Sequence, residues 1–441
     1  MSAGRDLART LDQKDLVLVV IGTVIGSGIW LVPGAVLQST AGDPGLALTV
    51  WLVGGIFSLL GALTFAELGA MHPDSGGSYT YVREAFGALP AFLLGWTLFL
   101  AINTGSMATL AVAFANYAGE FAPLGPLARR LVAAGMIALV AALNIRGTRQ
   151  AASVQNWSTG LKVGVILLLA ASGFLLGTHG STTASRAFTV PISGPVLSGA
   201  GVGLLGVLWA YEGWVNVTNS AGEARDPQRT FARGIVIGTA ALIAIYLIAN
   251  LGYLVALGPD QVAGTQRVAA DAVRVLYGPL AAKLVGGAVL VSVFSATNGL
   301  VLTSPRTYFS MARDGVFFSK LAEVHPRFGT PAFAILASAV WAILLTLTGT
   351  FEQLFTYVVF ASWLFAGLAA TGLFVLRRRR PDAPRPFRVP GYPLTPALFV
   401  AAASVVVVNT FIARPVQALA GLGIVLLGTP AYFYWKRARR I

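Results

Sequence analysis

Two short stretches, Gly26-Ser27-Gly28-Ile29 and Ala210-Tyr211-Glu212-Gly213-Trp214, interrupt segments of this chain that are otherwise apolar. A glycine-rich interruption weakens a helix and frees backbone hydrogen-bonding groups. Inside a membrane, such an interruption persists only where it lines a cavity or binds something. The two stretches fall in the first and the sixth apolar segments, and this spacing indicates a membrane transporter.

Composition places most of the chain in a membrane. Of its 441 residues, 56% are hydrophobic and 11% are charged, and the mean hydropathy is +0.74. The apolar segments have the length that crosses a bilayer. We expect twelve spans, at residues 15–38, 46–70, 89–118, 128–146, 152–177, 197–220, 232–257, 281–311, 331–349, 353–376, 393–412 and 416–435. The sequence therefore predicts an all-α polytopic membrane protein.

Charge predicts the orientation of these spans. Most of the 31 Lys and Arg residues lie in loops on the side of the N-terminus, so both termini are expected in the cytoplasm. The same asymmetry accounts for the net charge of +14, and no nucleic-acid partner is expected. The first residues lack a signal-peptide pattern, so the first span is expected to direct insertion. The chain has no cysteine, which excludes disulfides and thiolate metal centres.

Ten spans with interruptions in the first and sixth are what two inverted five-span repeats produce. We therefore divide the chain into a tail at 1–14, repeats at 15–178 and 179–376, a linker at 377–392, two last spans at 393–435, and a tail at 436–441. The linker begins with Arg377-Arg378-Arg379-Arg380. We interpret this run as a topology signal, with contact to anionic membrane lipid as the alternative.

The two interruptions offer opposite electrostatic poles. Free N–H groups at Ser27, Gly28 and Ile29 open a helix N-terminus, which suits a carboxylate. Free carbonyls around Trp209 and Ala210 end a helix, which suits an ammonium group. A zwitterionic α-amino acid fits both poles.

The alternative is that these glycines only let helices pack closely, which is how we interpret the isolated pair Gly173 and Gly177. For Gly26-Ser27-Gly28, the tight spacing and the matching interruption in the sixth span favour a binding site.

The motifs of the chain resemble those of the amino acid–polyamine–organocation superfamily, and within it those of bacterial L-type amino acid transporters, kin of the light chains of heteromeric amino acid transporters. The resemblance covers about residues 12–328 in motifs. It rests on Gly22-Thr23-Val24-Ile25-Gly26-Ser27-Gly28-Ile29, Glu67-Leu68-Gly69, Ser75-Gly76-Gly77-Ser78-Tyr79, Ala210-Tyr211-Glu212-Gly213-Trp214, Gly222-Glu223, Asp226-Pro227, Asn298-Gly299 and Thr303-Ser304-Pro305-Arg306.

This resemblance implies a LeuT-like fold in which the backbone of the first interruption holds the substrate carboxylate. Trp209, Tyr211 and Glu212 of the sixth span are then expected to select the side chain. The whole expected binding set is Thr23, Ile25, Gly26, Ser27, Gly28, Ile29, Trp209, Ala210, Tyr211, Glu212, Gly213 and Tyr246.

Lys162 lies within the fifth span. The resemblance implies that its ammonium replaces the ion of sodium-coupled relatives and bridges the first helix to Ser292 and Ser295. Independently, a lysine within a span costs about 2.5–3.5 kcal/mol on insertion scales and marks a functional site. The alternative is a lysine that extends to the membrane surface.

Several side chains have two interpretations. Glu212 can cap a freed helix end, our leading interpretation, or bind a proton or a cationic substrate side chain. Trp209 either narrows the pocket or packs as an ordinary aromatic residue. Tyr246 donates its hydroxyl either to the pocket or within the bundle. Glu67 and Arg83, which flank the first cytoplasmic loop, are expected to form a structural or gating contact.

Asn103 and Asn298 are expected to form hydrogen bonds between helices, with a supporting role at the pocket as the alternative. The stretch Gly201-Val202-Gly203-Leu204-Leu205-Gly206 spells a dinucleotide fingerprint, but it lies within an apolar span without a preceding strand. No cofactor is therefore predicted. The histidines at 72, 179 and 325 are scattered, so no metal site is predicted either.

The sequence therefore predicts a sodium-independent exchanger of L-α-amino acids, mainly neutral ones, and not an enzyme. The alternatives are proton-coupled amino acid uptake and uptake of cationic amino acids or polyamines. A channel would need a continuous polar pore lining, and an intramembrane hydrolase a catalytic pair at depth. We expect a single-subunit protein of a bacterial inner membrane, with no disulfide-linked partner.

Overall fold

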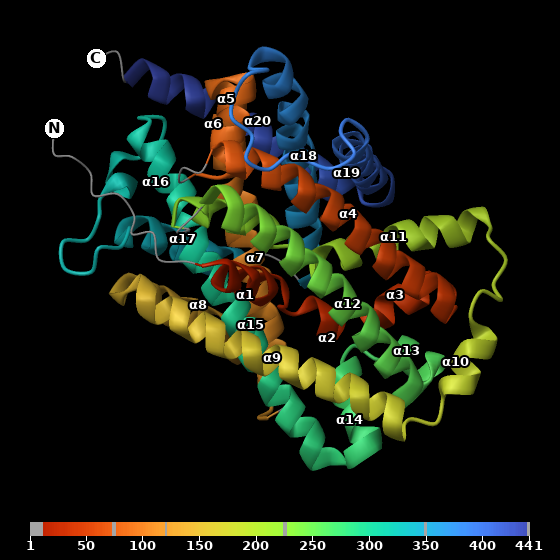
Figure 1. The fold of residues 1–441 in the computed structure, drawn as a ribbon. Helices are drawn as coiled ribbons and strands as arrows, with labels where there is room; N and C mark the ends of the chain where they lie inside the picture. The colour runs from red at the N-terminus through yellow and green to blue at the C-terminus, as the bar shows by residue number, and fades with distance from the viewer. Residues whose placement is uncertain (1–11, 73–75, 120, 224–226, 348–350, 439–441) are drawn as a thin grey trace.

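The computed structural model describes residues 12–72, 76–119, 121–223, 227–347 and 351–438, and this part of the chain is helical, with no strand (Figure 1). Most of the predicted N-terminal tail, the end of the C-terminal tail, and Ser75 and Asp226 of the motifs lie outside the described residues. The α-helices are α1 (Gln13–Val24), α2 (Gly28–Leu31), α3 (Pro33–Ser39), α4 (Pro44–Met71), α5 (Ser78–Phe86), α6 (Ala88–Thr97), α7 (Asn103–Ala118), α8 (Pro126–Arg146), α9 (Thr148–Leu176), α10 (Gly180–Arg186), α11 (Gly194–Ala210), α12 (Ala232–Leu257), α13 (Pro259–Ala263), α14 (Val268–Tyr277), α15 (Pro279–Thr303), α16 (Pro305–Arg313), α17 (Ala332–Thr346), α18 (Phe351–Arg379), α19 (Leu394–Ala413) and α20 (Pro415–Ala438). Four tighter or wider helical segments join them: η1 (Leu98–Ile102), η2 (Trp214–Glu223), η3 (Pro227–Phe231) and η4 (Ser319–Ala322).

Ten helices in the described part of the chain are long and apolar enough to cross a membrane. The apolar helix α17 is shorter, and the first predicted span is divided into α1, α2 and α3. The prediction of an all-α polytopic membrane protein is thereby confirmed.

The broken first span lies in the middle of the bundle. Helix α1 contacts α12, α9 and α15, and α12 in turn packs on α4 and α9 (Figure 1). Small residues let these helices approach: a Cβ on Gly173 of α9 would overlap the backbone of Gly252 of α12, and one on Gly177 would lie 2.5 Å from the Val255 carbonyl oxygen. The interpretation of these two glycines as packing residues fits this geometry.

Asp43 ties the start of α4 to a distant loop. Its buried carboxylate accepts the N–H groups of Gly45 and Leu46 in the first turn of α4, and those of Phe188 and Val190 after α10. Burial by itself raises the pKa of Asp43, but these four hydrogen bonds favour the ionised form and lower the pKa below its usual value. The carboxylate is therefore both a helix cap and a link between two segments.

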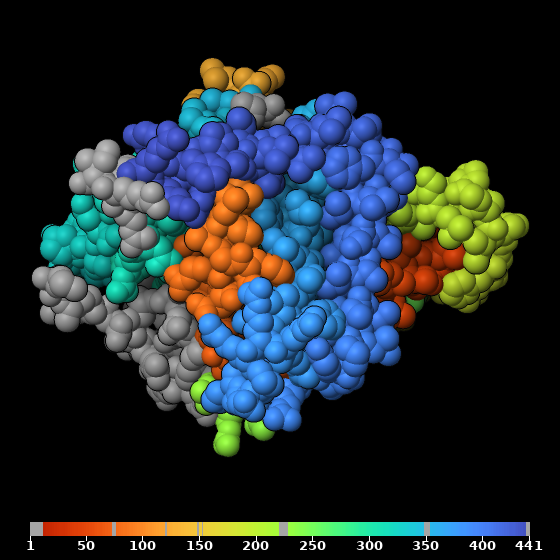
Figure 2. Space-filling view, turned by 90° about the horizontal axis from the view of Figure 1, so that it is seen from above, coloured from red at the N-terminus to blue at the C-terminus, as the bar shows by residue number. Residues whose placement is uncertain are grey.

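The linker between α18 and α19 folds over the end of α4. Figure 2 shows the blue C-terminal helices and their linker beside the orange α5–α6 region on this face of the molecule, in agreement with contacts of α18 with α5 and of α20 with α6. Glu67 and Arg83 do not pair with each other in the structure. Each forms an ion pair with a different residue. Arg83 pairs with Asp314, which also accepts the hydroxyl of Tyr79 at 2.8 Å.

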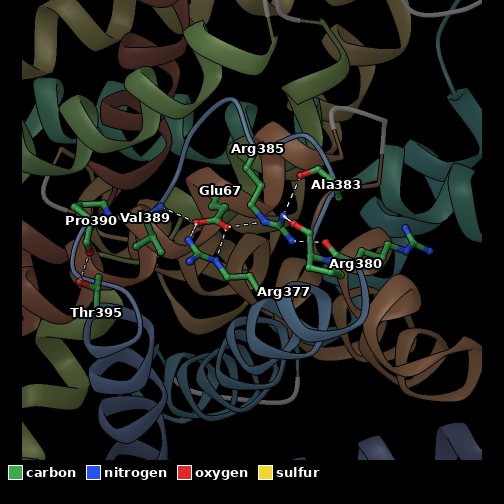
Figure 3. A network of polar contacts seen from close by, with 9 residues as sticks. Glu67, Arg377, Arg380, Ala383, Arg385, Val389, Pro390 and Thr395 are labelled. Carbon is green, nitrogen blue, oxygen red and sulfur yellow. Dashed lines mark hydrogen bonds and ion pairs between the residues drawn. The ribbon is translucent and has the colours of Figure 1, made fainter.

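Glu67, near the end of α4, is fully buried and lies at the centre of a polar network with Arg377, Arg385 and Val389 (Figure 3). Arg377 donates hydrogen bonds to both carboxylate oxygens of Glu67, at 2.8 and 2.6 Å. The Val389 N–H donates to Oε2 at 2.7 Å. The Nε atom of Arg385 lies 3.5 Å from Oε1. Arg377 therefore faces the protein interior, while Arg378, Arg379 and Arg380 are exposed.

Candidate substrate site

The first interruption separates α1 from α2. Helix α1 ends at Val24, and α2 begins at Gly28, with Ser27 at its N-cap position. The Ser27 carbonyl accepts the N–H groups of Trp30 and Leu31. Within the described residues, no backbone carbonyl accepts the N–H groups of Ser27, Gly28 or Ile29. These three groups are the donors that the sequence assigns to a carboxylate.

The second interruption meets the first one directly. Helix α11 ends at Ala210, and a Cβ on Gly28 would overlap the backbone of this residue. Gly213 has φ of 125°, and a Cβ there would lie 3.2 Å from the Thr23 carbonyl oxygen. A side chain at residue 28 would separate the two crossing segments, and the positive φ at residue 213 favours glycine there.

A cavity lies where the two interruptions meet. Its lining residues come from α1, α2, α7, α11, α15 and the segment after α11: Thr23, Val24, Gly26, Ser27, Gly28, Ser106, Leu110, Trp209, Glu212, Gly213, Asn216 and Leu300. Seven residues of the expected binding set line it: Thr23, Gly26, Ser27, Gly28, Trp209, Glu212 and Gly213. The other five, Ile25, Ile29, Ala210, Tyr211 and Tyr246, lie outside this lining.

Sequence reasoning missed Ser106 and Asn216 as polar lining residues. Asn216 lies three residues after Gly213, where the broken span continues, and this position is a signal that could have found it. The Ser106 hydroxyl donates to the carbonyl of Ile102, four residues earlier in the same span, a pattern common to many serines in spans. No local signal distinguishes it.

Tyr246 of α12 bridges the two interruptions. Its hydroxyl donates to the carbonyl oxygen of Ala210 at 2.9 Å and lies 3.4 Å from that of Val24, so it contacts helix ends on both sides. Its ring packs against Trp51 and Tyr211, with centroids 5.6 and 4.9 Å away. The structure therefore favours the second interpretation of this tyrosine, a hydroxyl satisfied within the bundle.

Trp209 and Glu212 belong to the cavity wall. The Trp209 Nε1–H donates to Ser27 Oγ at 3.4 Å, and its ring packs on Phe355. Glu212 Oε1 accepts the hydroxyl of Ser362 from α18 at 2.8 Å. Of the side chains that the structure describes, no Lys or Arg forms an ion pair with Glu212. The hydrogen bond between Glu212 and Ser362 joins the cavity wall to α18, and it does not cap a helix end.

Lys162 caps the end of α1. The side chain is fully buried, and its Nζ donates to the carbonyls of Gly22 at 2.5 Å and Ile25 at 2.7 Å. A cation at a helix C-terminus is favoured by the helix dipole. Burial argues against the alternative of a lysine that extends to the membrane surface.

Ser292 of α15 reaches the same carbonyl groups. Its Oγ lies 3.3 Å from the Ile25 oxygen and 3.2 Å from that of Gly26, and it accepts the Trp30 Nε1–H at 3.3 Å. Ser295 instead contacts Ser158 at 2.6 Å. Of the expected coupling residues, Lys162 and Ser292 thus meet at the first interruption, whereas Ser295 faces α9.

The asparagines that we assigned to contacts between helices form such contacts. Asn103 Nδ2 donates to the Tyr308 hydroxyl at 3.0 Å. Asn298 accepts from Asn144 at 2.8 Å and donates to the Ala151 carbonyl at 2.9 Å. Neither residue lines the cavity.

Two broken helices that cross at a cavity within an apolar bundle define a membrane transporter. The model of the family described as "Amino acid permease" matches residues 11–429, and the chain belongs to this family of amino acid transporters.

Relatives from bacteria and mammals share most of the chain. It is 31% identical to the serine/threonine exchanger SteT of Bacillus subtilis, over 96% of this chain and 95% of that protein. It is 34% identical to the large neutral amino acids transporter small subunit 2 of Mus musculus, over 95% of this chain and 80% of that protein. It is 33% identical to the b(0,+)-type amino acid transporter 1 of Mus musculus, over 87% and 80%.

Proposed function

We propose that the protein is a sodium-independent exchanger of L-α-amino acids, mainly neutral ones, that works by alternating access. The observation that carries this proposal is the position of Lys162, whose ammonium holds two carbonyls at the end of α1. An ammonium group carried by the protein at this point makes a bound sodium ion unnecessary. The relatives named as exchangers and amino acid transporters support the substrate class.

The architecture proposed with this function has twelve spans. Repeats at residues 15–178 and 179–376 form a LeuT-like inverted pair with broken first and sixth spans, and the last two spans follow the linker. The excess of Lys and Arg on one side supports cytoplasmic termini in a bacterial inner membrane. Without cysteine, no disulfide to a partner subunit can form.

The substrate is proposed to lie between the two interruptions. Its carboxylate binds the free N–H groups of Ser27, Gly28 and Ile29, and its side chain faces Trp209 and Glu212. Neither carbonyl assigned to the ammonium is free: that of Trp209 accepts the Glu212 N–H at 3.0 Å, and that of Ala210 accepts from Tyr246. A carbonyl oxygen has a second lone pair that can accept from the ammonium.

Counterflow in liposomes tests this proposal. Purified protein is reconstituted into liposomes loaded with unlabelled amino acid, and uptake of labelled amino acids is followed with and without sodium and with a pH gradient. We expect exchange that is independent of sodium and of the gradient. Concentrative uptake into empty liposomes driven by the pH gradient would show proton coupling instead. Equal uptake of decarboxylated amines would refute the carboxylate assignment.

A second candidate substrate class rests on Glu212. This carboxylate lines the cavity and has only a neutral partner, Ser362, among the described residues. Glu212 is half-buried, and a carboxylate at this depth without a cation favours either a proton or a cationic substrate side chain. Preferred exchange of lysine and arginine over serine and leucine, lost in the Glu212→Gln variant, would establish the cationic class.

A further inference from the structure

Asn216 is a polar residue of the cavity wall whose side chain has no partner in the described part of the protein. Its backbone N–H donates to the Gly213 carbonyl at 3.0 Å, which holds the residue in the segment after α11. Its side-chain amide forms no hydrogen bond or ion pair with any residue that the structure describes. Only 7% of the residue is exposed, and it borders the cavity. A partner for this amide is therefore expected within the cavity.

The other polar side chains of the lining are already bonded or enclosed. Glu212, Ser27 and Ser106 each form a hydrogen bond with another residue. Thr23 Oγ1 has no partner within the described residues, but protein atoms enclose it, whereas the Asn216 amide is not enclosed. Among the described lining residues, this amide is thus the polar side-chain group that is both open and unpartnered.

The rest of the lining includes an apolar wall. It consists of Val24, Leu110 and Leu300, each at most 5% exposed. Such a wall favours aliphatic carbon atoms of a substrate, while the amide of Asn216 favours a hydrogen-bonding group. A side chain that carries a hydroxyl on a small apolar frame meets both conditions.

We propose that Asn216 selects amino acids with a hydroxyl on a short side chain, threonine and serine, over apolar side chains of the same size. This inference rests on the proposed function, in which the substrate lies between the two interruptions. The substrate hydroxyl forms a hydrogen bond with the Asn216 amide, which can donate through Nδ2 or accept through Oδ1. An apolar side chain would fill the same space and leave the amide unpaired, so it binds less favourably.

Threonine and valine form the sharpest comparison, because they differ by a hydroxyl in place of a methyl group. In a purely apolar cavity, valine would bind better, since a hydroxyl that leaves water without a partner costs free energy. A site that bonds the hydroxyl reverses this order, and such sites reject the analogue without it by factors of up to about 10⁴–10⁵. We expect a preference of at least about tenfold for threonine over valine. Serine should be preferred over alanine in the same sense.

The first test is counterflow with the wild-type protein. Liposomes are loaded with a mixture of unlabelled amino acids, and the uptake of labelled threonine and valine is measured over a range of concentrations. The ratio of their kcat/KM values gives the preference. Valine transported as well as threonine, or better, would overturn the inference and leave the exchanger intact. No exchange of any α-amino acid would refute the proposed function itself, and this inference with it.

The second test removes the amide. Asn216→Leu and Asn216→Ala should each bring the ratio of threonine to valine to about one or below, because neither side chain can bond the hydroxyl. Both changes break no side-chain hydrogen bond to a described residue. Asn409→Leu is the matched control, since the amide of Asn409 donates to the Gly201 carbonyl at 3.1 Å and does not line the cavity. Its ratio should equal that of wild type.

Two outcomes of this second test would overturn the role of Asn216. One is a wild-type ratio retained in both Asn216 variants. The other is a ratio that is lost in Ser106→Ala but retained in Asn216→Leu, which would assign the selection to α7.

Ligand-induced stabilisation gives a readout that does not depend on transport. Threonine at a fixed concentration should raise the thermal midpoint of wild-type protein in detergent more than valine does, because a ligand stabilises in proportion to its affinity. In Asn216→Leu, the two amino acids should raise the midpoint equally. A variant that folds but no longer transports is therefore still informative. A threonine shift that remains larger than the valine shift in Asn216→Leu would contradict the assignment.

Discussion

Replacing Arg377 by methionine should destabilise the protein strongly, because it removes the main partner of a buried carboxylate. Glu67 has no exposed surface, and Arg377 donates to both of its oxygens. Methionine keeps much of the apolar stem of the side chain. It removes the charge together with the stacking of the guanidinium on Tyr392, in which Cζ lies 3.7 Å from the ring centroid. The Arg377→Met variant thus leaves Glu67 with the Val389 N–H and the more distant Arg385.

The magnitude follows from burial. Breaking a buried ion pair from one side costs about 3–5 kcal/mol, since the remaining charge is uncompensated. Arg385 remains near Glu67, so we expect the lower end, about 3 kcal/mol, or a ratio of folded to unfolded protein that is roughly 150-fold smaller. The double variant Glu67→Gln/Arg377→Met removes both charges. It should be more stable than the sum of the two single changes predicts, by at least about 1 kcal/mol.

Equilibrium unfolding in mixed micelles, with a rising fraction of sodium dodecyl sulfate and helical circular dichroism as the signal, measures these differences. Arg378→Met is the matched control, because this neighbouring arginine is exposed. Its effect should stay within about 0.5 kcal/mol. An Arg377→Met variant as stable as the control, or purely additive single changes, would refute the reasoning that Glu67 depends on this arginine.

Three further predictions concern the substrate site and its outer edge. Gly28→Val should abolish exchange with insertion intact, because the side chain would separate α2 from Ala210. Gly164→Val is the control, because a Cβ at Gly164 would meet no atom within 4 Å. Normal substrate binding by Gly28→Val would show that the glycine serves only helix packing. Lys162→Ala should slow exchange at least about tenfold with a smaller loss of binding, whereas an unchanged exchange rate would remove the lysine from the mechanism. Asp43 has a lowered pKa, so its stabilisation of the fold is present above pH 3.8 and lost as the pH falls through the folded-state pKa. The thermal midpoint of the Asp43→Asn variant should lie below that of wild type at pH 7 and close to it at strongly acidic pH. Equal thermal midpoints at pH 7 would contradict this.

Helix positions could be predicted from the sequence because they depend on the lengths of apolar runs. The predicted range 232–257 coincides with α12, and most other ranges end within a few residues of the observed helices. The first span is an exception, since it is divided into three helices, first at Gly26-Ser27-Gly28 and again before Pro33. Apolar length alone cannot show such a division, whereas the glycine spacing at Gly26 and Gly28 does.

The cavity could be predicted only where the backbone determines it. Gly28 needs glycine because a Cβ would overlap the backbone of Ala210, and Gly213 needs it because its φ is positive. The partners of side chains could not be predicted, because they depend on tertiary packing. Tyr246 bonds a carbonyl 222 residues away, and Glu212 bonds Ser362, 150 residues away. No local pattern carries that information.

The pairing of Glu67 with the linker also bears on the order of events during synthesis. Arg377 follows Glu67 by 310 residues, so the carboxylate leaves the ribosome long before its partner exists. At about 5–20 residues per second, this interval is roughly 15–60 s. During that time, α4 has to remain inserted with its terminal charge in water or among lipid headgroups. The end of α4 can therefore reach its final buried position only after α18 and the linker have been made, so a segment 310 residues further along the chain completes one of the first helices to be inserted.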